Sequence, residues 1–172
     1  ETAKSSTPMW CRKKLEQGIK VVMNETEHDV WEFITNARNE FSKLPIEEVS
    51  FPRGVQNVTK YSNPASIYNK GTPIHVRGSL LYNNYLSKYH IDKKYPVITN
   101  GEKVKFCYLK MPNVINENVI SFVNALPKEF ELEPYIDYET QFNKSFVEPL
   151  GVILNKIGWT TEPVSTLNEF FG

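Results

Sequence analysis

The sequence predicts an α+β fold that is mainly α-helical, in which a helical hairpin and further helices pack with a small antiparallel β element. Three stretches of apolar residues at helical spacing, within residues 11–22, 30–44 and 74–85, predict the helices. Between residues 103 and 122 the pattern changes to that of β-strands. At 172 residues, of which 40% are hydrophobic, the chain is long enough to bury a core.

The first two helices are expected to form an antiparallel hairpin. Hydroxyl residues before Pro8 predict a capped helix start, and apolar residues at helical spacing carry this helix to about Asn24. Thr26 and Asp29 offer a cap for the second helix, whose apolar stripe reaches residue 44. Pro45 should end it, because proline lacks the N–H that the helix needs. Both stripes are typical of core packing and indicate no chemistry.

A third helix is predicted near the middle of the chain, with Thr72 as its N-cap and Pro73 at its first helical position. One face carries residues at intervals of four, three and four, namely Ile74, Gly78, Leu81 and Tyr85. Other faces are apolar too, so this helix should be covered on more than one side. Gly78 costs roughly 1 kcal/mol relative to alanine inside a helix. Its presence predicts that another segment approaches the backbone closely there.

The remaining elements are less regular. Three segments are predicted as strands: residues 48–51, 103–111 and 119–122. Residues 52–71 are expected to be irregular. From Tyr135 the pattern becomes helical again, with Pro149 expected to kink or break the helix and Gly158 expected to end it.

The formal net charge is zero, but the charges are unevenly distributed along the chain. Residues 51–110 hold 10 Lys+Arg against 2 Asp+Glu, whereas residues 111–172 hold 3 against 9 and residues 1–50 hold 7 against 9. Such segregation predicts a face that meets anions, with nucleic acid as the leading candidate. The alternative is that the fold mixes the charges again in space.

Few residues suggest catalysis. Two-metal phosphoryl transfer needs carboxylates paired at close range, but Asp29, Asp92 and Asp137 are isolated in the sequence. The histidines at positions 28, 75 and 90 show no metal-ligand spacing, and no phosphate-binding loop or G-x-S-x-G motif occurs. The sequence therefore predicts no catalytic residue and no metal site in this chain alone.

The two cysteines, Cys11 and Cys107, lie far apart in the sequence. Two buried free thiols in a reducing compartment are expected, with a disulfide as the alternative. No run of 18 apolar residues occurs, so no membrane partner is expected.

The last stretch has the composition of a loop but carries Leu167, Phe170 and Phe171. Two adjacent phenylalanines in a polar segment suit an anchor peptide that docks in a groove on a partner. The alternative is that this segment folds back onto the rest of the chain.

Three segments, taken in order, resemble one family of proteins. They are Glu-Thr-Ala-Lys-Ser-Ser-Thr-Pro at positions 1–8, Pro-Ile-His-Val-Arg-Gly-Ser-Leu-Leu-Tyr-Asn at 73–83, and Ser-Thr-Leu-Asn-Glu-Phe-Phe-Gly at 165–172. Their order is similar to that at the C-terminus of the family B replicative DNA polymerases of T-even-like phages. Phe-Asn-Lys-Ser-Phe-Val-Glu-Pro-Leu at 142–150 resembles the same region, including its proline. The resemblance covers nearly the whole chain.

The resemblance implies that residues 1–160 are the thumb domain of such a polymerase and that residues 161–172 are a tail that binds the sliding clamp. Leu167, Phe170 and Phe171 would be the clamp anchor. The palm, with its catalytic aspartates and Mg²⁺, and the exonuclease domain would lie upstream of Glu1 and act as partners of the thumb. No cofactor is expected in this chain itself, and the cytoplasm of the infected bacterial host is the expected location.

A thumb holds primer–template duplex DNA through phosphates or the minor-groove edge, without reading the sequence. The hydroxyls near the N-terminus, beside free helix N–H groups, and the basic middle third suit this role. The candidate contacts are Lys4, Ser5, Ser6, Thr7, Lys13, Lys60, Lys70, His75, Arg77 and Lys88. Two alternatives stay open: a non-enzymatic adaptor that binds DNA or protein, and a separately encoded C-terminal subunit of a split polymerase.

Overall fold

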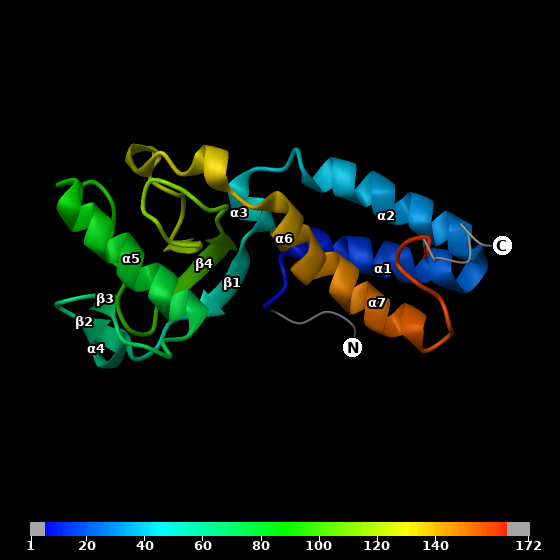
Figure 1. The fold of residues 1–172 in the computed structure, drawn as a ribbon, viewed down its shortest axis with the longest axis horizontal. Coiled ribbons are helices and arrows are strands. Elements are labelled where there is room, and N and C mark those ends of the chain that lie inside the picture. The colour runs from blue at the N-terminus through cyan, green and yellow to red at the C-terminus, as the bar shows by residue number, and fades with distance from the viewer. Residues whose placement is uncertain (1–5, 165–172) are drawn as a thin grey trace, which may run out of the picture.

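The computed structural model describes residues 6–164, which form two lobes, each with its own hydrophobic core (Figure 1). The helical lobe comprises residues 6–50 and 138–164, and the mixed lobe comprises residues 51–137. The fully buried side chain of Gln141 joins them, because it donates to the Val49 carbonyl at 2.6 Å and accepts from the Tyr108 N–H at 2.8 Å. The prediction of an α+β, mainly helical fold is confirmed.

In the helical lobe, α1 (Met9–Asn24) and α2 (Glu27–Phe41) form the predicted antiparallel hairpin. The cap of α2 is confirmed: Thr26 Oγ1 accepts from the Asp29 N–H at 3.2 Å, and the Asp29 carboxylate accepts from the Thr26 N–H at 3.0 Å. The hydroxyl cap expected for α1 is wrong. The N-cap residue of α1 is Pro8, whose ring supplies no hydrogen bond to the first turn.

The last helix of this lobe passes through a proline without breaking. Helix α6 (Tyr138–Phe142) continues through a π-helical turn (Asn143–Val147) into α7 (Glu148–Asn155). In the π turn the Glu148 N–H donates to the Asn143 carbonyl, five residues back, directly before Pro149. Of the kink or break that the sequence predicts, the break does not occur, because the wider turn carries the helix up to Pro149. A turn at Gly158, with φ at +77°, follows α7.

The mixed lobe is built on a three-stranded antiparallel sheet in the order β1 (Phe51–Gly54), β4 (Lys103–Tyr108) and β5 (Val119–Phe122). Strands β4 and β5 confirm two of the predicted segments. The strand predicted at 48–51 begins three residues later, because α3 (Ile46–Val49) forms a helical turn first.

Residues 52–71 are more regular than their composition suggests. Besides most of β1, they contain helix α4 (Val58–Tyr61) and a hairpin of β2 (Ser62–Asn63) and β3 (Ile67–Tyr68). Two short 3₁₀ turns, Lys128–Phe130 and Glu133–Tyr135, lie in the connection that follows the sheet.

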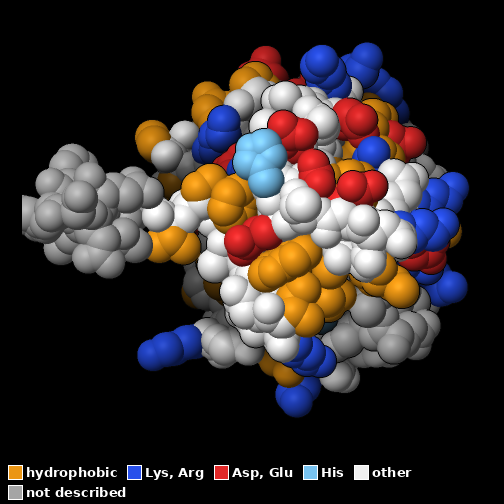
Figure 2. Space-filling view, turned by 90° about the vertical axis from the view of Figure 1, so that its right-hand side faces the viewer, with side chains coloured by type: hydrophobic (Ala, Val, Ile, Leu, Met, Phe, Trp, Pro, Cys, Tyr) orange, Lys and Arg blue, Asp and Glu red, His pale blue; other side chains and the backbone are white. Residues whose placement is uncertain are grey.

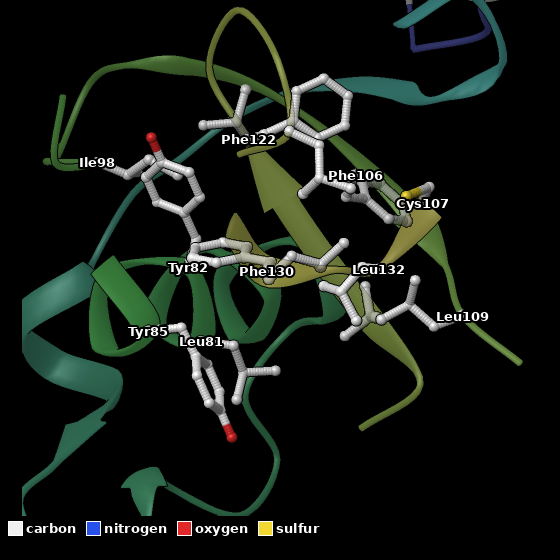
Figure 3. Close-up of a cluster of buried hydrophobic side chains, with 14 of the residues drawn as sticks. Leu81, Tyr82, Tyr85, Ile98, Phe106, Cys107, Leu109, Phe122, Phe130 and Leu132 are labelled. Carbon is white, nitrogen blue, oxygen red and sulfur yellow. The ribbon is translucent and has the colours of Figure 1, made fainter. Parts of the chain in front are cut away.

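Helix α5 (Ile74–Lys88) packs on the sheet and is buried on more than one side, as predicted. A Cβ at Gly78 would lie 2.9 Å from the Ser121 nitrogen, and the Ser121 hydroxyl donates to the His75 carbonyl at 3.0 Å. The close approach expected at Gly78 is therefore confirmed. Figure 3 shows Tyr82 of α5 beside Phe130 in the buried cluster of this lobe, and their ring centroids are 5.9 Å apart.

The predicted cap of α5 is wrong. Pro73 occupies the N-cap, and the Thr72 hydroxyl donates instead to the Asn69 carbonyl at 2.5 Å. Thr72 thus closes the turn that leads out of the β2–β3 hairpin.

Both cysteines are buried and free, so the expectation of two free thiols is confirmed. Burial raises the pKa of Cys11 to about 11 and that of Cys107 to about 12. Both therefore stay protonated and poorly reactive near neutral pH.

Candidate nucleic-acid interface

The charge contrast seen along the sequence survives in space, although it is weaker. The mixed lobe holds 11 Lys+Arg against 7 Asp+Glu, a net charge of +4, because residues 111–137 bring acidic side chains into it. The described part of the helical lobe holds 8 against 11, a net charge of −3. Some of those acidic side chains pair with the basic third, as in the ion pairs of Arg77 with Glu117 and Lys94 with Glu129. The mixed lobe remains the side that favours an anion.

A first group of side chains surrounds Arg53, where the chain enters α1 and passes close to the sheet. It comprises Ser6, Arg53 and His75, and we call it the junction group. Arg53 donates to the Ser6 carbonyl at 2.9 Å, and its guanidinium lies 5.5 Å from the ring centroid of Phe106. His75 lies against the same ring, at 6.4 Å between centroids. Burial, followed by the positive charge of Arg53, lowers the pKa of His75, so this histidine is mainly neutral at pH 7. The structure thus brings the predicted Ser6 and His75 together around Arg53, whereas the predicted Thr7 is placed there only by its position next to Ser6 in the chain.

Two hollows in the surface flank the junction group. One, of about 380 Å³, is lined by Ser6, Arg53 and Lys103. The other, of about 420 Å³, lies beside the first turn of α1 and is lined by Arg12, Lys13 and Lys105, together with Glu47 and Glu48. Within the described chain, Arg12 Nε is buried and has no hydrogen-bond partner.

The second group, the hairpin group, surrounds β2 and β3. Lys60 and Lys70 are exposed there. Arg77 is different, because its side chain is only 20% exposed and its Nη1 lies 3.0 Å from Glu117 Oε2. Its guanidinium also lies over the ring of Tyr68, 5.6 Å from the centroid. Arg77 is therefore already paired within the chain.

Lys88 stands apart from both groups. It is the last residue of α5, and its Nζ lies 5.3 Å from the ring centroid of Tyr85. At 1.5 Å per residue, it lies roughly 20 Å along the helix axis from His75. The ten predicted contacts therefore fall into separate places, and Lys4 and Ser5 lie outside the described residues.

Sequence reasoning left several side chains of this surface out of the predicted contacts, among them Arg53 at the centre of the junction group. Lys103 and Lys105 project from the same side of β4, and the alternation of that strand was the available signal. Glu117 gave no signal, because it lies in a loop 40 residues beyond Arg77.

One group of possible metal ligands occurs among residues 6–164. His28, Asp29 and Glu32 lie on the first turns of α2 with ligand atoms within 4.8 Å of one another. The Asp29 carboxylate is already engaged by the Thr26 backbone and hydroxyl, and these bonds lower its pKa. This group is largely exposed and lies at the end of the helical lobe, away from the basic groups.

Figure 2 looks onto that end of the helical lobe, where acidic and hydrophobic side chains share the centre and most Lys and Arg lie toward the rim. Thr160 is fixed there, because its carbonyl accepts from Trp31 Nε1 at 2.8 Å and its N–H donates to Glu27 at 2.9 Å. Between α7 and residues 160–164 lies a hollow of about 800 Å³, lined partly by the exposed Val152 and Val164. The predicted anchor residues Leu167, Phe170 and Phe171 lie outside the described residues.

Within residues 6–164, none of the helices is both long enough and apolar enough to cross a membrane.

Comparison with known proteins gives a consistent result. The chain is 30% identical over 176 aligned positions to the DNA-directed DNA polymerase of Enterobacteria phage T4, and the alignment covers 100% of this chain. It is also 30% identical to the DNA-directed DNA polymerase of Escherichia phage RB69, over 99% of this chain. Along its whole length, the chain is similar to a segment of phage DNA polymerases. It spans 19% of the length of each of these two relatives.

This similarity supports the interpretation of the chain as a fragment of a phage DNA-directed DNA polymerase. No protein-family model matches the chain.

Proposed function

We propose that this chain is the thumb of a family B phage DNA-directed DNA polymerase, which holds the primer–template duplex. The observation that carries the proposal is the 30% identity along the whole chain to the DNA polymerases of T4 and RB69. The catalytic carboxylates with their Mg²⁺, and the exonuclease, would belong to other domains of the same polymerase. The work of the chain would then be done in the cytoplasm of the infected bacterium.

The two basic groups on the mixed lobe and its junction support a holding role. Lys13, Lys60, Lys70 and Lys103 are exposed, as a contact to DNA phosphates requires. Such contacts carry no sequence information, which suits a polymerase that must hold every sequence. His75 is half-buried and mainly neutral, so in this proposal it helps to shape the surface and does not add charge.

Arg77 needs a separate account. Its charge is balanced by Glu117, and both side chains are only about one-fifth exposed. A phosphate contact by Arg77 therefore requires the phosphate to replace Glu117.

The first test is binding of the chain to a primer–template duplex at several salt concentrations, with single-stranded DNA of equal length alongside. We expect the chain to prefer duplex over single-stranded DNA and to bind unrelated sequences equally well. The slope of log affinity against log salt concentration should be negative, and its magnitude should grow by about 0.9 for each phosphate neutralised. Lys13→Ala and Lys103→Ala should each reduce this slope by about 1.

The matched control is Lys156→Ala, because Lys156 is an exposed lysine just beyond α7 on the helical lobe. It should leave the slope unchanged. Absence of duplex binding at low salt, or an equal effect at Lys156, would contradict the proposed function.

A further inference from the structure

The Arg77–Glu117 ion pair belongs to a three-residue arrangement on the mixed lobe. Arg77 Nη1 lies 3.0 Å from Glu117 Oε2, and the Tyr68 hydroxyl donates to Glu117 Oε1 at 2.7 Å. The guanidinium lies over the ring of Tyr68, so the arginine is held by the ring and by the carboxylate. We call these three residues the Glu117 latch.

The loop that carries Glu117 is organised by Asn113. The Asn113 side-chain amide donates to the Glu117 carbonyl at 2.6 Å, and its Oδ1 accepts from the Ile115 N–H at 3.0 Å. Asn116, within the same loop, has φ at +54°, a left-handed conformation that asparagine tolerates. These bonds fix the backbone next to Glu117 and direct its carboxylate toward Arg77.

The latch sits inside the hairpin group, where it holds two separate segments together. Tyr68 belongs to β3 and Arg77 to the first turn of α5. Asn69 ties the same hairpin to α4, because its side-chain amide donates to the Lys60 carbonyl at 3.2 Å. The latch therefore connects the segment that carries Lys60 and Lys70 to the rest of the mixed lobe.

A carboxylate and a backbone phosphate offer an arginine the same kind of acceptor, namely negatively charged oxygens. We propose that Glu117 is a positioning residue that holds Arg77 in place of a DNA phosphate until the duplex binds. This inference rests on the proposed function, and it adds a residue that regulates the contact.

The geometry supports an exchange of partners. Glu117 is 21% exposed, so an incoming phosphate can reach the pair from solvent. When Glu117 leaves, Tyr68 can still hold the guanidinium through its ring. The Tyr68 hydroxyl can donate to a phosphate oxygen as it does to Glu117. Arg77 would thus be presented in a fixed orientation, and a neighbouring anion would prevent a tight grip on stray anions.

The test is duplex binding by Glu117→Gln across a series of salt concentrations. The amide keeps the shape of the side chain but removes the charge that competes with phosphate. Affinity should rise about tenfold, which corresponds to one extra charge-assisted contact. The slope of log affinity against log salt should steepen by about 0.9, because in the wild-type chain the charge of the displaced Glu117 offsets the phosphate that Arg77 neutralises.

Two controls distinguish this exchange of partners from a general change in the electrostatic potential of the mixed lobe. Glu129 has the same kind of partners in the same lobe, since it accepts from the Tyr95 hydroxyl at 3.0 Å and lies 3.5 Å from Lys94. Glu129→Gln removes the same charge and should leave the salt slope unchanged. In an Arg77→Ala background, Glu117→Gln should give no gain.

Each result has a distinct meaning. Wild-type binding with no gain in Glu117→Gln overturns the latch but leaves the proposed function intact. An equal gain in Glu129→Gln, or a gain that persists without Arg77, also overturns it. If neither the wild-type chain nor any variant binds duplex at low salt, the proposed function and the latch fail together. A Glu117→Gln chain whose urea unfolding midpoint falls while its salt slope stays unchanged shows a purely structural role.

Discussion

Gly78 allows α5 to approach β5 closely, because it has no side chain beyond a hydrogen atom. A methyl group on Gly78 would meet the Ser121 nitrogen at 2.9 Å and the Ile120 carbonyl carbon at 3.1 Å. Both are backbone atoms of a fully buried strand, so they have little freedom to move. We predict that Gly78→Ala destabilises the chain by about 1–3 kcal/mol, despite the better helix propensity of alanine.

Gly18→Ala is the matched control, because Gly18 also lies inside a helix. Its added methyl would meet side-chain atoms of Phe33 and Leu150, the nearest being Phe33 Cε1 at 3.3 Å, and side chains yield more readily than a strand backbone. Urea unfolding of both variants checks the prediction. Equal midpoints would show that the strand moves aside and that the close approach is not needed.

Residue-scale prediction from sequence worked where a residue type has one unusual property. Gly78 was identifiable because glycine is unfavourable in a helix unless its lack of a side chain is used. The partner of Arg77 was not identifiable, since a glutamate in a loop 40 residues away carries no periodic signal. The role of Thr72 was predicted wrongly because a threonine hydroxyl can form a hydrogen bond either in a helix cap or in a turn. In the structure, it donates to the Asn69 carbonyl in the turn that follows the β2–β3 hairpin.

At the scale of elements, the start of α2 offers a clean measurement of a helix cap. Thr26 and Asp29 satisfy each other's backbone N–H groups. We predict that Thr26→Ala lowers stability by about 1 kcal/mol, the usual contribution of such a cap. The control is Thr35→Ala within α2, whose exposed hydroxyl donates only to the Trp31 carbonyl, and which should be nearly neutral.

Thermal or urea unfolding of the two variants makes the comparison. An equal loss in both would mean that the capping box contributes nothing beyond the loss of a hydroxyl. The pKa of Asp29 is lowered by its bonds to Thr26, so the stabilisation is present above the ordinary carboxyl pKa and disappears as the pH falls below it.

Elements with a strong period were predictable, and irregular ones were not. The stripes of α1, α2 and α5 and the strands β4 and β5 follow from spacing alone. The π turn before Pro149 was not predictable, because the missing N–H of proline predicts only that the helix will kink or break. The structure widens one turn instead, with the Glu148 N–H reaching back to Asn143.

At the scale of the whole molecule, the division into two lobes could not be read along the chain. The helical lobe takes its core from both ends of the described chain, for example Leu15 and Phe146, while the mixed lobe uses the middle. The thirds into which the charges fall therefore do not coincide with the lobes. The acidic segment after β4 joins the basic one, and this reduces the net charge of the mixed lobe to +4.

The sliding-clamp contact that the family resemblance implies is also proposed here, and it belongs to this scale because it would join the chain to a second protein. Alanine at Leu167, Phe170 and Phe171 should abolish capture of the chain by its phage's sliding clamp in a pull-down and leave duplex binding intact. The reason is that the apolar side chains would fill a groove on the clamp.

Alanine at Asn168 and Glu169 is the control, because it changes the same segment without removing an apolar side chain. The sliding clamp should still capture this control variant. Unchanged capture of the triple variant would exclude these residues as the anchor.

The fixing of Thr160 by Trp31 and Glu27 sets a limit on distance. Phe171 lies seven residues beyond Val164, the last described position, and seven residues span at most about 25 Å when fully extended. A partner held by that phenylalanine must therefore contact it within about 25 Å of Val164. The distance between such a partner and a duplex held by the chain would then have an upper limit set by this reach.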